Sequence, residues 1–285
     1  MIFPALTVRG GLLVKPLYLP FVFLLMFSIK GFAAGGGLPV GAVAAGMGRC
    51  SVALNGVWSI QNNQAGLASI SNITLGLNYG NRFLIKETGI NDFAVVVPTK
   101  YGVAGLSLNY FGFNLYNEIK AGLSYGRSFG KFLRIGLQLD YLQIALGENY
   151  GKKPGVTFEL GVQSDITGNL TLGFWTYNPV MIRLAGYADE RIPAIFRLGF
   201  AYRFSDWLIT TVEAEKRTDY MPVTIRGGME YSLKRKFLLR AGFGTGEEIF
   251  SMGFGLKLKR LTLDIAAVMH NSLGFSPEMG LTVLF

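Results

Sequence analysis

Residues 131–141 read KFLRIGLQLDY, and from Leu133 onward apolar and polar side chains alternate without a break. The odd-numbered positions are apolar, and the even-numbered positions are Arg134, Gly136, Gln138 and Asp140. Successive side chains of a β-strand point to opposite faces, so the stretch predicts a strand with one apolar and one polar face. GVTFELGVQ at 155–163 and AIFRLGFAYR at 194–203 repeat the pattern.

The same period of two residues continues from Asn72 to the last residue of the chain. It predicts about fourteen strands of roughly 8–12 residues, the length that a tilted strand needs to cross a bilayer. The predicted strands are 72–79, 91–98, 102–112, 117–127, 131–145, 154–164, 169–178, 193–203, 206–216, 221–232, 236–245, 248–258, 260–269 and 276–285. An even number suits a closed antiparallel barrel, which leaves no strand edge exposed.

The composition indicates which face of these strands meets lipid. Half of the residues are hydrophobic, yet no run of about 18 apolar residues follows residue 34, which leaves a soluble β-protein or a β-barrel in lipid. The polar face carries Gly, Thr and charged residues that suit a wet lumen, and aromatic residues gather near strand ends as an interfacial girdle requires. We predict an all-β fold, a transmembrane antiparallel β-barrel of about 14 strands.

The N-terminus has the features of an export signal. Arg9 and Lys15 precede the apolar run Leu17–Ile29, and small residues follow it, which predicts a signal peptide at 1–33 with cleavage after Ala33. A retained anchor is the alternative. Cleavage lowers the formal charge from +9 to +6, because three of the 27 basic residues are lost and none of the 18 acidic ones. With no nucleic-acid motif present, we predict no nucleic-acid partner.

The connections between predicted strands alternate in length. Longer connections often follow the odd-numbered strands, at 80–90, 146–153, 179–192 and 270–276, with short exceptions near Phe113 and Thr245, and tight turns follow the even-numbered ones. Outer-membrane barrels have short periplasmic turns and longer external loops. We therefore expect the protein in the outer membrane of a Gram-negative bacterium, with both termini periplasmic.

Residues 34–71 differ from everything that follows. Gly41–Ile70 reads GAVAAGMGRCSVALNGVWSIQNNQAGLASI, is rich in Gly and Ala, and has neither a strand period nor a helix period. Arg49 is its one charged residue, and Cys50 is the one cysteine of the chain, so no disulfide forms within the chain. Lipid cannot satisfy an irregular backbone, so we predict that 34–71 is a plug inside the lumen of a barrel formed by 72–285.

Several motifs in this stretch resemble the N-terminal signature of the PorV/PorQ-type outer-membrane proteins, which are relatives of the FadL barrels. The usual form is a small-residue run "AMGGA", then "VAL", a short polar stretch and "NPAGLA". Gln64 stands where the family has Pro, and Arg49 stands where a second Gly is common. The residues that carry the plug motif are Gly46, Met47, Gly48, Asn63, Ala65, Gly66 and Leu67.

The resemblance implies a barrel of fourteen strands with the N-terminal segment inside. It also implies a non-enzymatic subunit or accessory of a protein-export or envelope complex, similar to type IX secretion components, with a protein partner. The alternative is a FadL-like transporter of hydrophobic small molecules, and a structural barrel without a passenger is a third possibility. The inward positions are mostly polar, which argues against a site for an alkyl chain.

The inward faces of predicted strands eight to eleven carry charges of both signs, which can pair across the sheet. These lumen charges are Arg197, Arg203, Glu213, Glu215, Arg226, Glu230 and Arg240. One interpretation is a solvated lumen, and the other is a charge ladder that holds the plug or a polar passenger. Glu213 and Glu215 lack the context of a catalytic pair, and His270 lacks a second ligand for a metal. We therefore expect no catalytic residues, no metal and no cofactor.

Two surface features concern partners. Lys234, Arg235 and Lys236 form a basic turn, with Lys257 to Arg260 in the next predicted turn on that side, and clustered cations favour an acidic protein or anionic lipid. Leu281, Val283 and Phe285 give the last strand an apolar face and an aromatic end, the form of a signal for the barrel-assembly machinery. The apolar outer faces predict outer-membrane lipid as the surrounding medium.

Overall fold

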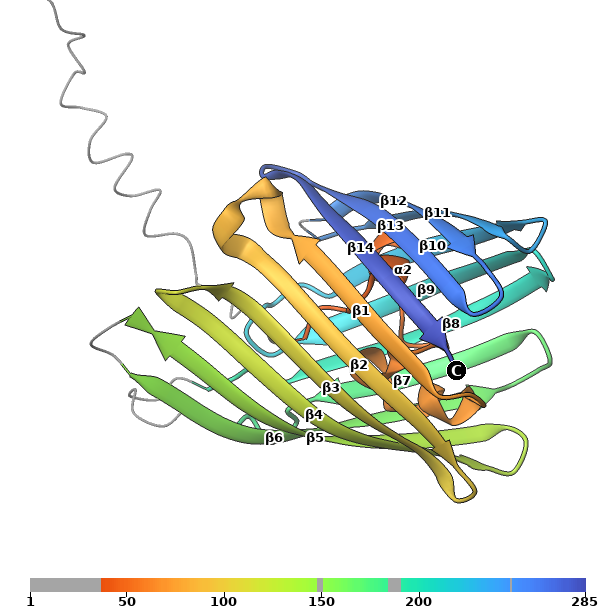
Figure 1. Ribbon diagram of the computed structural model, residues 1–285, viewed down its shortest axis with the longest axis horizontal. Helices are drawn as coiled ribbons and strands as arrows, with labels where there is room; N and C mark the ends of the chain where they lie inside the picture. The colour runs from red at the N-terminus through yellow and green to blue at the C-terminus, as the bar shows by residue number, and fades with distance from the viewer. Residues whose placement is uncertain (1–36, 148–150, 184–190, 247) are drawn as a thin grey trace, which may run out of the picture. The chain divides into compact units, whose positions relative to one another are not determined.

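The computed structural model describes residues 37–147, 151–183, 191–246 and 248–285, which form a closed barrel of fourteen strands (Figure 1). Every strand pairs antiparallel with its neighbours in sequence, and β1 pairs with β14 to close the sheet. The predicted all-β antiparallel barrel is confirmed. The predicted signal peptide at 1–33 and the first residues of the predicted plug, 34–36, lie outside the described residues.

The strands form a simple up-and-down meander in which each connects to the next. They are β1 Thr74–Asn81, β2 Gly89–Thr99, β3 Gly102–Phe113, β4 Tyr116–Phe129, β5 Leu133–Leu146, β6 Lys152–Asp165, β7 Leu170–Tyr177, β8 Ile195–Ser205, β9 Leu208–Arg217, β10 Thr224–Leu233, β11 Phe237–Gly244, β12 Glu248–Lys257, β13 Leu261–His270 and β14 Gly274–Leu284. No observed strand end lies more than three residues from its predicted position. Alternation alone therefore located every strand.

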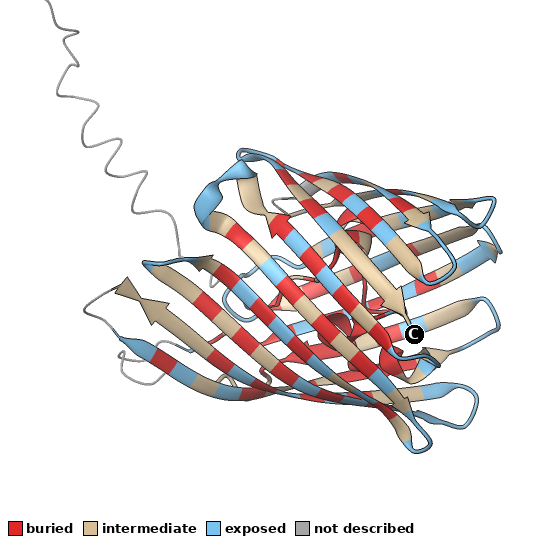
Figure 2. Cartoon of the chain, in the orientation of Figure 1, coloured by how far each residue is buried: buried red, intermediate tan, exposed pale blue. Residues whose placement is uncertain are grey.

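The two faces of the wall are divided as the alternation predicts. Gln138 and Asp140 are buried, whereas their neighbours Leu137 and Leu139 are 45% and 57% exposed. Buried and exposed bands alternate along the strands in Figure 2. In the first of the strands quoted above, the polar residues thus face the lumen and the apolar residues face outward.

Residues 37–73 precede the barrel and pack against its inner wall; we call 37–71 the plug segment. It contains three short helices, α2 Ala42–Gly46, α3 Ser59–Asn62 and η1 Gln64–Ser69. Helix α2 packs against β11 to β14, and η1 packs against β3 to β6. Within the described residues, no helix has the length and apolar character that crossing a membrane requires.

Apolar contacts join the plug segment to the wall in three separate clusters. Val52 and Ala53 pack with Trp175, Tyr177 and Ile195. A second cluster joins Val57, Trp58, Ile60, Leu67, Ala94, Val96 and Val103. A third joins Ala42, Ala45, Ala266 and Val268. The core of the molecule is thus the contact between the plug segment and the lumen side of the barrel.

The two rims of the barrel differ in their connections. The tight-turn rim holds the short turns that follow even-numbered strands, together with Phe285, whose amide donates to the carbonyl of Ile73. The loop rim holds the remaining connections. Gly37, the first described residue, lies against Ile195 at the loop end of β8, so the described chain starts near one rim and ends at the other. The expected periplasmic N-terminus itself lies outside the described residues.

Candidate functional site: the interface between plug segment and wall

Glycines on the inner wall allow the plug segment to approach the sheet at backbone contact distance. A Cβ atom on Gly242 would lie 2.0 Å from the backbone nitrogen of Gly48, and one on Gly228 would lie 2.3 Å from the carbonyl oxygen of Met47. The corresponding distance from Gly173 to the carbonyl oxygen of Val52 is 2.3 Å. Gly136 and Gly161 serve η1 in the same way. These inward glycines explain why the polar faces of the strands are rich in this residue.

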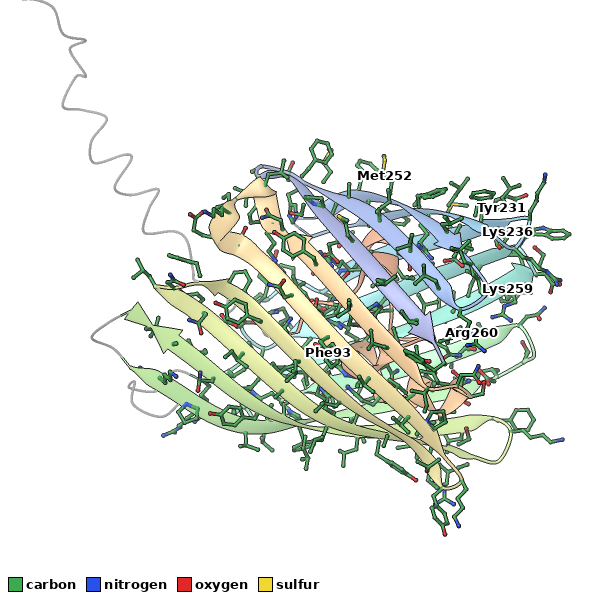
Figure 3. The ribbon with its side chains drawn as sticks, in the orientation of Figure 1. Phe93, Tyr231, Lys236, Met252, Lys259 and Arg260 are labelled. Carbon is green, nitrogen blue, oxygen red and sulfur yellow. The ribbon has the colours of Figure 1, made fainter. Side chains whose placement is uncertain are left out.

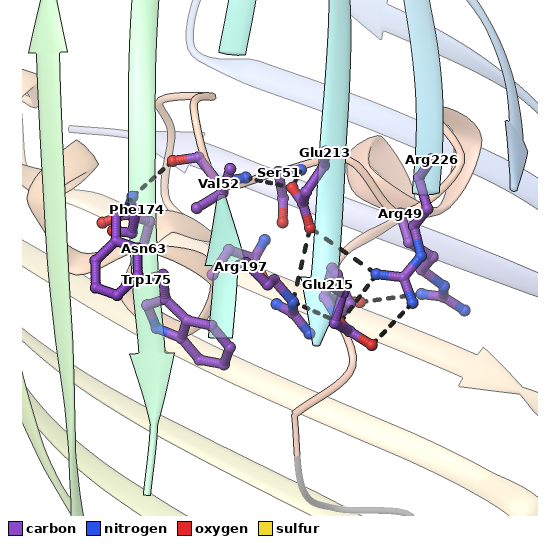
Figure 4. Close-up of polar contacts among 12 residues, drawn as sticks. Arg49, Ser51, Val52, Asn63, Phe174, Trp175, Arg197, Glu213, Glu215 and Arg226 are labelled. Atoms are coloured by element: carbon purple, nitrogen blue, oxygen red, sulfur yellow. Dashed lines mark hydrogen bonds and ion pairs between the residues drawn. The ribbon is translucent and has the colours of Figure 1, made fainter. Parts of the chain in front are cut away.

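Glu213 on β9 binds the plug segment through its backbone. Its Oε2 atom accepts hydrogen bonds from the amides of Ser51, at 2.8 Å, and Val52, at 2.9 Å (Figure 4). Ser51 and Val52 lie in an irregular stretch between α2 and α3, where the backbone amides have no helical partner. A single wall carboxylate therefore satisfies two buried donors that would otherwise cost about 1–3 kcal/mol each.

Two arginines and a second glutamate complete this acid–arginine cluster, which we define as Arg197, Glu213, Glu215 and Arg226. Glu215 accepts from Arg197 Nε at 2.7 Å and from Arg226 Nη1 at 2.9 Å. Both arginines also face Glu213 Oε1, at 3.6 and 3.9 Å. The cluster contains two positive and two negative groups from three adjacent strands, so it is neutral without any charge from the plug segment.

Several polar atoms of the cluster have no hydrogen-bond partner while the plug segment is in place. They are Glu213 Oε1 and the two terminal nitrogens of Arg197, and both residues are 1% exposed. The Arg197 guanidinium instead lies over the Trp175 ring, 4.4 Å from its centroid. If the Ser51 and Val52 amides move away, Glu213 has a cation within reach. The wall thus has a partner for this carboxylate with or without the plug segment.

A second anchor, the Glu159 network, holds a plug side chain. Gln64 Nε2 donates to Glu159 Oε2 at 2.6 Å, and Trp175 Nε1 donates to the same atom at 3.0 Å. Lys120 Nζ contacts the other oxygen at 2.6 Å, and Gln138 approaches it at 3.3 Å. Gln64, one of the two residues that depart from the motif of the resembling proteins, therefore inserts into this buried network.

Arg49, the charged residue of the plug segment, binds the wall on the opposite side. Its Nη2 atom lies 2.6 Å from Glu278 on β14, and its Nη1 donates to the carbonyl of Pro39 at 3.0 Å. Nearby, Asn78 on β1 accepts from the amide of Ala42 at 3.1 Å. The side chain that replaces a usual Gly thus pairs with a buried wall acid.

Asn63 links the plug segment to itself and to the wall. Its Nδ2 atom donates to the carbonyl of Val52 at 2.6 Å and lies 3.2 Å from the carbonyls of Val162 and Phe174 on β6 and β7. Its Oδ1 accepts from the amide of Ala65, which caps η1. The motif residues Ala65, Gly66 and Leu67 follow within η1 and are buried. Gly46, Met47 and Gly48 lie against β10 to β12.

Two hollows lie on opposite sides of the wall. A cavity of about 30 Å³ lies between Arg49, Gln61, Asp92, Lys120 and Glu278. That volume holds about two water molecules, given roughly 10–15 Å³ for each. A larger hollow of about 760 Å³ is lined by outward-facing side chains such as Leu77, Leu108 and Met279, on the outer face of the wall.

The structure brings some of the predicted lumen charges together and separates others. Arg197, Glu213, Glu215 and Arg226 meet in one cluster. Arg240 forms a separate group, 2.7 Å from both Glu230 and Asp264. Arg203, expected as a lumen charge, is exposed at the tight-turn rim, because it lies at the end of β8 where an irregularity shifts the register.

Sequence reasoning missed the Glu159 network and the pair of Arg49 with Glu278. Lys120 and Glu159 occupy inward positions of β4 and β6, so alternation gives their orientation. Their partners, however, come from strands that are distant in sequence. Glu213 and Glu215 are each bonded to amides or guanidinium groups rather than to one another.

Cys50 and His270 both pack against neighbouring side chains of the described residues. The Cys50 thiol is buried beside Thr211, and its burial raises its pKa to about 12. His270 Nε2 lies 2.9 Å from Ser276 Oγ, and its ring packs edge-on against Phe83. Among the described residues, no three His, Cys, Asp or Glu side chains gather as metal ligands would.

The predicted partner and assembly residues lie at the tight-turn rim. Lys234, Arg235 and Lys236 are exposed in the β10–β11 turn, and Arg235 pairs with Asp206 at 2.9 Å. Leu281 and Val283 are half-buried on the outward phase of β14, and Phe285 is 66% exposed after it. The structure therefore exposes the residues of both features without showing what binds them.

Solved structures with a similar fold include proteins named as channels and transporters. The CymD monoaromatic hydrocarbon channel has a TM-score of 0.66 at 14% identity, covering 87% of this chain and 98% of that one. The Ralstonia pickettii toluene transporter TbuX scores 0.67 at 13% identity, covering 91% and 100%. A Pseudomonas aeruginosa FadL homologue scores 0.58 at 13% identity, covering 87% and 98%. No protein-family model and no curated protein matches the sequence. The fold is that of the FadL-like outer-membrane barrels.

Proposed function

We propose that this chain is an outer-membrane channel that passes a small hydrophobic molecule when its plug segment moves. The fold is shared with proteins named as hydrocarbon channels and a toluene transporter. In this proposal residues 1–33 direct export, the barrel-assembly machinery inserts the strands, and the tight-turn rim faces the periplasm. The protein carries out no chemical reaction on its passenger.

The one of the three apolar clusters that contains stacked aromatic rings carries the proposal. Trp175 and Tyr177 stack with their ring centroids 6.3 Å apart at an interplanar angle of 17°. Leu142, Ile192 and Ile195 surround them near the loop rim. The plug residues Val52 and Ala53 now cover this surface. Their departure would expose an apolar, aromatic patch against which a hydrophobic passenger would pack, where each buried CH₂ contributes about 0.8 kcal/mol.

Anchoring by a neutral wall cluster suits a plug segment that is displaced repeatedly. Glu213 exchanges two backbone donors for a neighbouring guanidinium when Ser51 and Val52 leave, so no bare charge is created in the lumen. An unpaired buried charge would instead cost several kcal/mol. The hydrogen bonds to Glu213 therefore favour the plug segment in place, while the neighbouring arginines keep the free-energy cost of its displacement low.

The test compares polar substitutions in two of the apolar clusters between the wall and the plug segment. Leu142→Gln with Ile195→Gln changes the aromatic cluster, whereas Val96→Gln with Val103→Gln changes the separate cluster around Ile60. In cells with equal amounts of heat-modifiable barrel, we expect the first pair to lower uptake of radiolabelled toluene by about tenfold, as loss of roughly 1.4 kcal/mol of binding gives. The second pair should lower it less than about threefold.

Equal loss in the two pairs, or no uptake by the wild type above cells that lack the barrel, would contradict the proposed passage. Palmitate tested beside toluene sets the upper size of the passenger. A protein that transports neither compound points to the second candidate below.

The second candidate is an accessory of a protein-export complex of the PorV/PorQ or type IX secretion kind. The observation that favours it is the close contact between plug segment and wall, where a cavity of only about 30 Å³ has Arg49, Lys120 and Glu278 in its lining. In a deletion strain this role predicts loss of exported proteins from the cell surface with unchanged uptake of hydrophobic compounds. Unchanged surface proteins would exclude it.

A further inference from the structure

The tight-turn rim contains a hollow that the proposed passage of small molecules does not use. Its volume is about 460 Å³, and every residue that lines it belongs to β8 to β12 or to the turns between them. Three basic side chains from different segments meet there, namely Arg203, Arg235 and Lys257. We propose that this hollow, the rim pocket, binds an acidic segment of a protein partner on that side of the membrane.

The position of the lining residues determines which partner reaches the pocket. Ser232 and Leu238 are paired across β10 and β11 and share the inward phase with Arg226 and Arg240. Their neighbours Tyr231 and Leu239 face outward and are 42% and 49% exposed. The pocket thus opens on the lumen side of the wall, at the mouth of the barrel. Acyl chains contact the outer side, so a water-borne partner fits this position better than a lipid.

The charges in the pocket are not balanced. Asp206 is 2.9 Å from Arg235, and Glu230 is 2.7 Å from Arg240, so both acids of the lining are engaged. Neither Arg203 nor Lys257 forms an ion pair with an acid among the described residues. A ligand carboxylate would supply the missing acceptor for these two cations.

The rest of the rim strengthens the attraction for an acidic chain. Ten cationic side chains are exposed there, and Asp206 is the one exposed acid among the described residues of this rim. Lys236, Lys259 and Arg260 gather at that end of the barrel in Figure 3. The exposed cations are Lys100, Arg127, Lys131, Arg203, Lys234, Arg235, Lys236, Lys257, Lys259 and Arg260. A surface of one sign steers an oppositely charged partner toward its site.

Apolar groups beside the cations narrow the chemistry of the ligand. Trp207, which is 58% exposed, lines the pocket with Leu208 and Leu238. Carboxylates would bind Arg203 and Lys257, while an apolar side chain would pack against Trp207. The preferred ligand is therefore a peptide segment that mixes acidic and apolar residues. This inference does not depend on passage of small molecules through the lumen.

The test measures binding of a fluorescein-labelled hexapeptide of four glutamates and two leucines to the full-length barrel in phosphatidylcholine nanodiscs. The pocket variant carries Arg203→Gln, Arg235→Gln and Lys257→Gln. The control variant carries Lys100→Gln, Arg127→Gln and Lys131→Gln, which removes the same charge from the opposite part of the same rim. We expect affinity to fall by about tenfold or more in the pocket variant and by less than about threefold in the control.

Heat-modifiable mobility of both variants establishes that each barrel has folded. Equal loss in the two variants would overturn the pocket and leave only general attraction by the rim. Absence of measurable binding by the wild type would also overturn it. Replacing part of the phosphatidylcholine by phosphatidylglycerol gives the last outcome: if this lipid alone competes the peptide away in the wild type and not in the pocket variant, the ligand is a lipid headgroup and the proposal is wrong.

Discussion

The acid–arginine cluster and the Glu159 network both hold the plug segment, but they contact different parts of it. Glu213 accepts hydrogen bonds from the backbone amides of Ser51 and Val52, so these bonds do not depend on which side chains the two positions carry. Glu159 accepts a hydrogen bond from the side chain of Gln64, so this contact requires a side-chain donor at position 64. A substitution of Gln64 in the plug segment can therefore abolish the contact with Glu159. The contact with Glu213 uses backbone amides, so only a substitution of Glu213 in the wall can remove it.

The largest expected effect is that of Glu213→Ala. It leaves two buried amides without an acceptor and two arginines with one carboxylate, which costs about 3–5 kcal/mol when a buried pair is broken. We expect the plug segment to leave the wall and the thiol of Cys50 to react with a maleimide more than about 100-fold faster. Glu230→Ala is the control, because Arg240 keeps Asp264. An unchanged rate in Glu213→Ala would show that the amide contacts do not hold the segment.

Gly242→Ala should have the next largest effect. The new methyl group would lie 2.0 Å from the nitrogen of Gly48, where only backbone movement can make room. Overpacking of this kind costs about 1–3 kcal/mol, and we expect the conductance of single barrels in planar bilayers to rise as the segment is displaced. Gly168→Ala, with nothing within 4 Å, is the matched control. Equal conductance of the two variants would argue against close approach at β11.

Gln64→Ala and Gln64→Pro test the side-chain anchor. Both remove the hydrogen bond to Glu159, while Lys120, Gln138 and Trp175 remain to satisfy this carboxylate. The expected loss is about 1–3 kcal/mol, seen as faster maleimide labelling of Cys50 than in the wild type and slower than in Glu213→Ala. Proline is tolerated at the first position of a helical turn, so the two variants should agree. A Gln64→Pro rate equal to the wild type would mean that the hydrogen bond contributes nothing.

The pH dependence of labelling gives the smallest and most specific effect. With the plug segment in place, burial holds the pKa of Cys50 near 12, so the thiolate is scarce at neutral pH. When the plug segment leaves the wall, the pKa of the Cys50 thiol returns toward about 8.5, the value of a free thiol. In Glu213→Ala the labelling rate should therefore level off above about pH 8.5, whereas the wild-type rate should still be rising there. Identical pH profiles would contradict release.

The sequence predicted the barrel far better than it predicted the anchors. Alternation fixed the strands because a two-residue period is local, and it also gave the inward orientation of Lys120 and Glu159. The acceptor role of Glu213 could not be predicted, because its ligands are backbone amides that have no sequence signature. Alternation gave the inward phase of Arg203 but not its exposure at the rim, because alternation describes which face a residue occupies and not how near the rim it lies.

The central claim is that the plug segment must move away from the wall for a molecule to pass. The Cys50 thiol contacts the Thr211 side chain on β9, so Thr211→Cys places a second thiol beside the native one. Oxidation would join the plug segment to the wall, and reduction would free it. We predict that toluene uptake by this variant stops on oxidation and returns with a reductant, while the wild type is unaffected by either. Full uptake by the variant with the disulfide formed would contradict the claim.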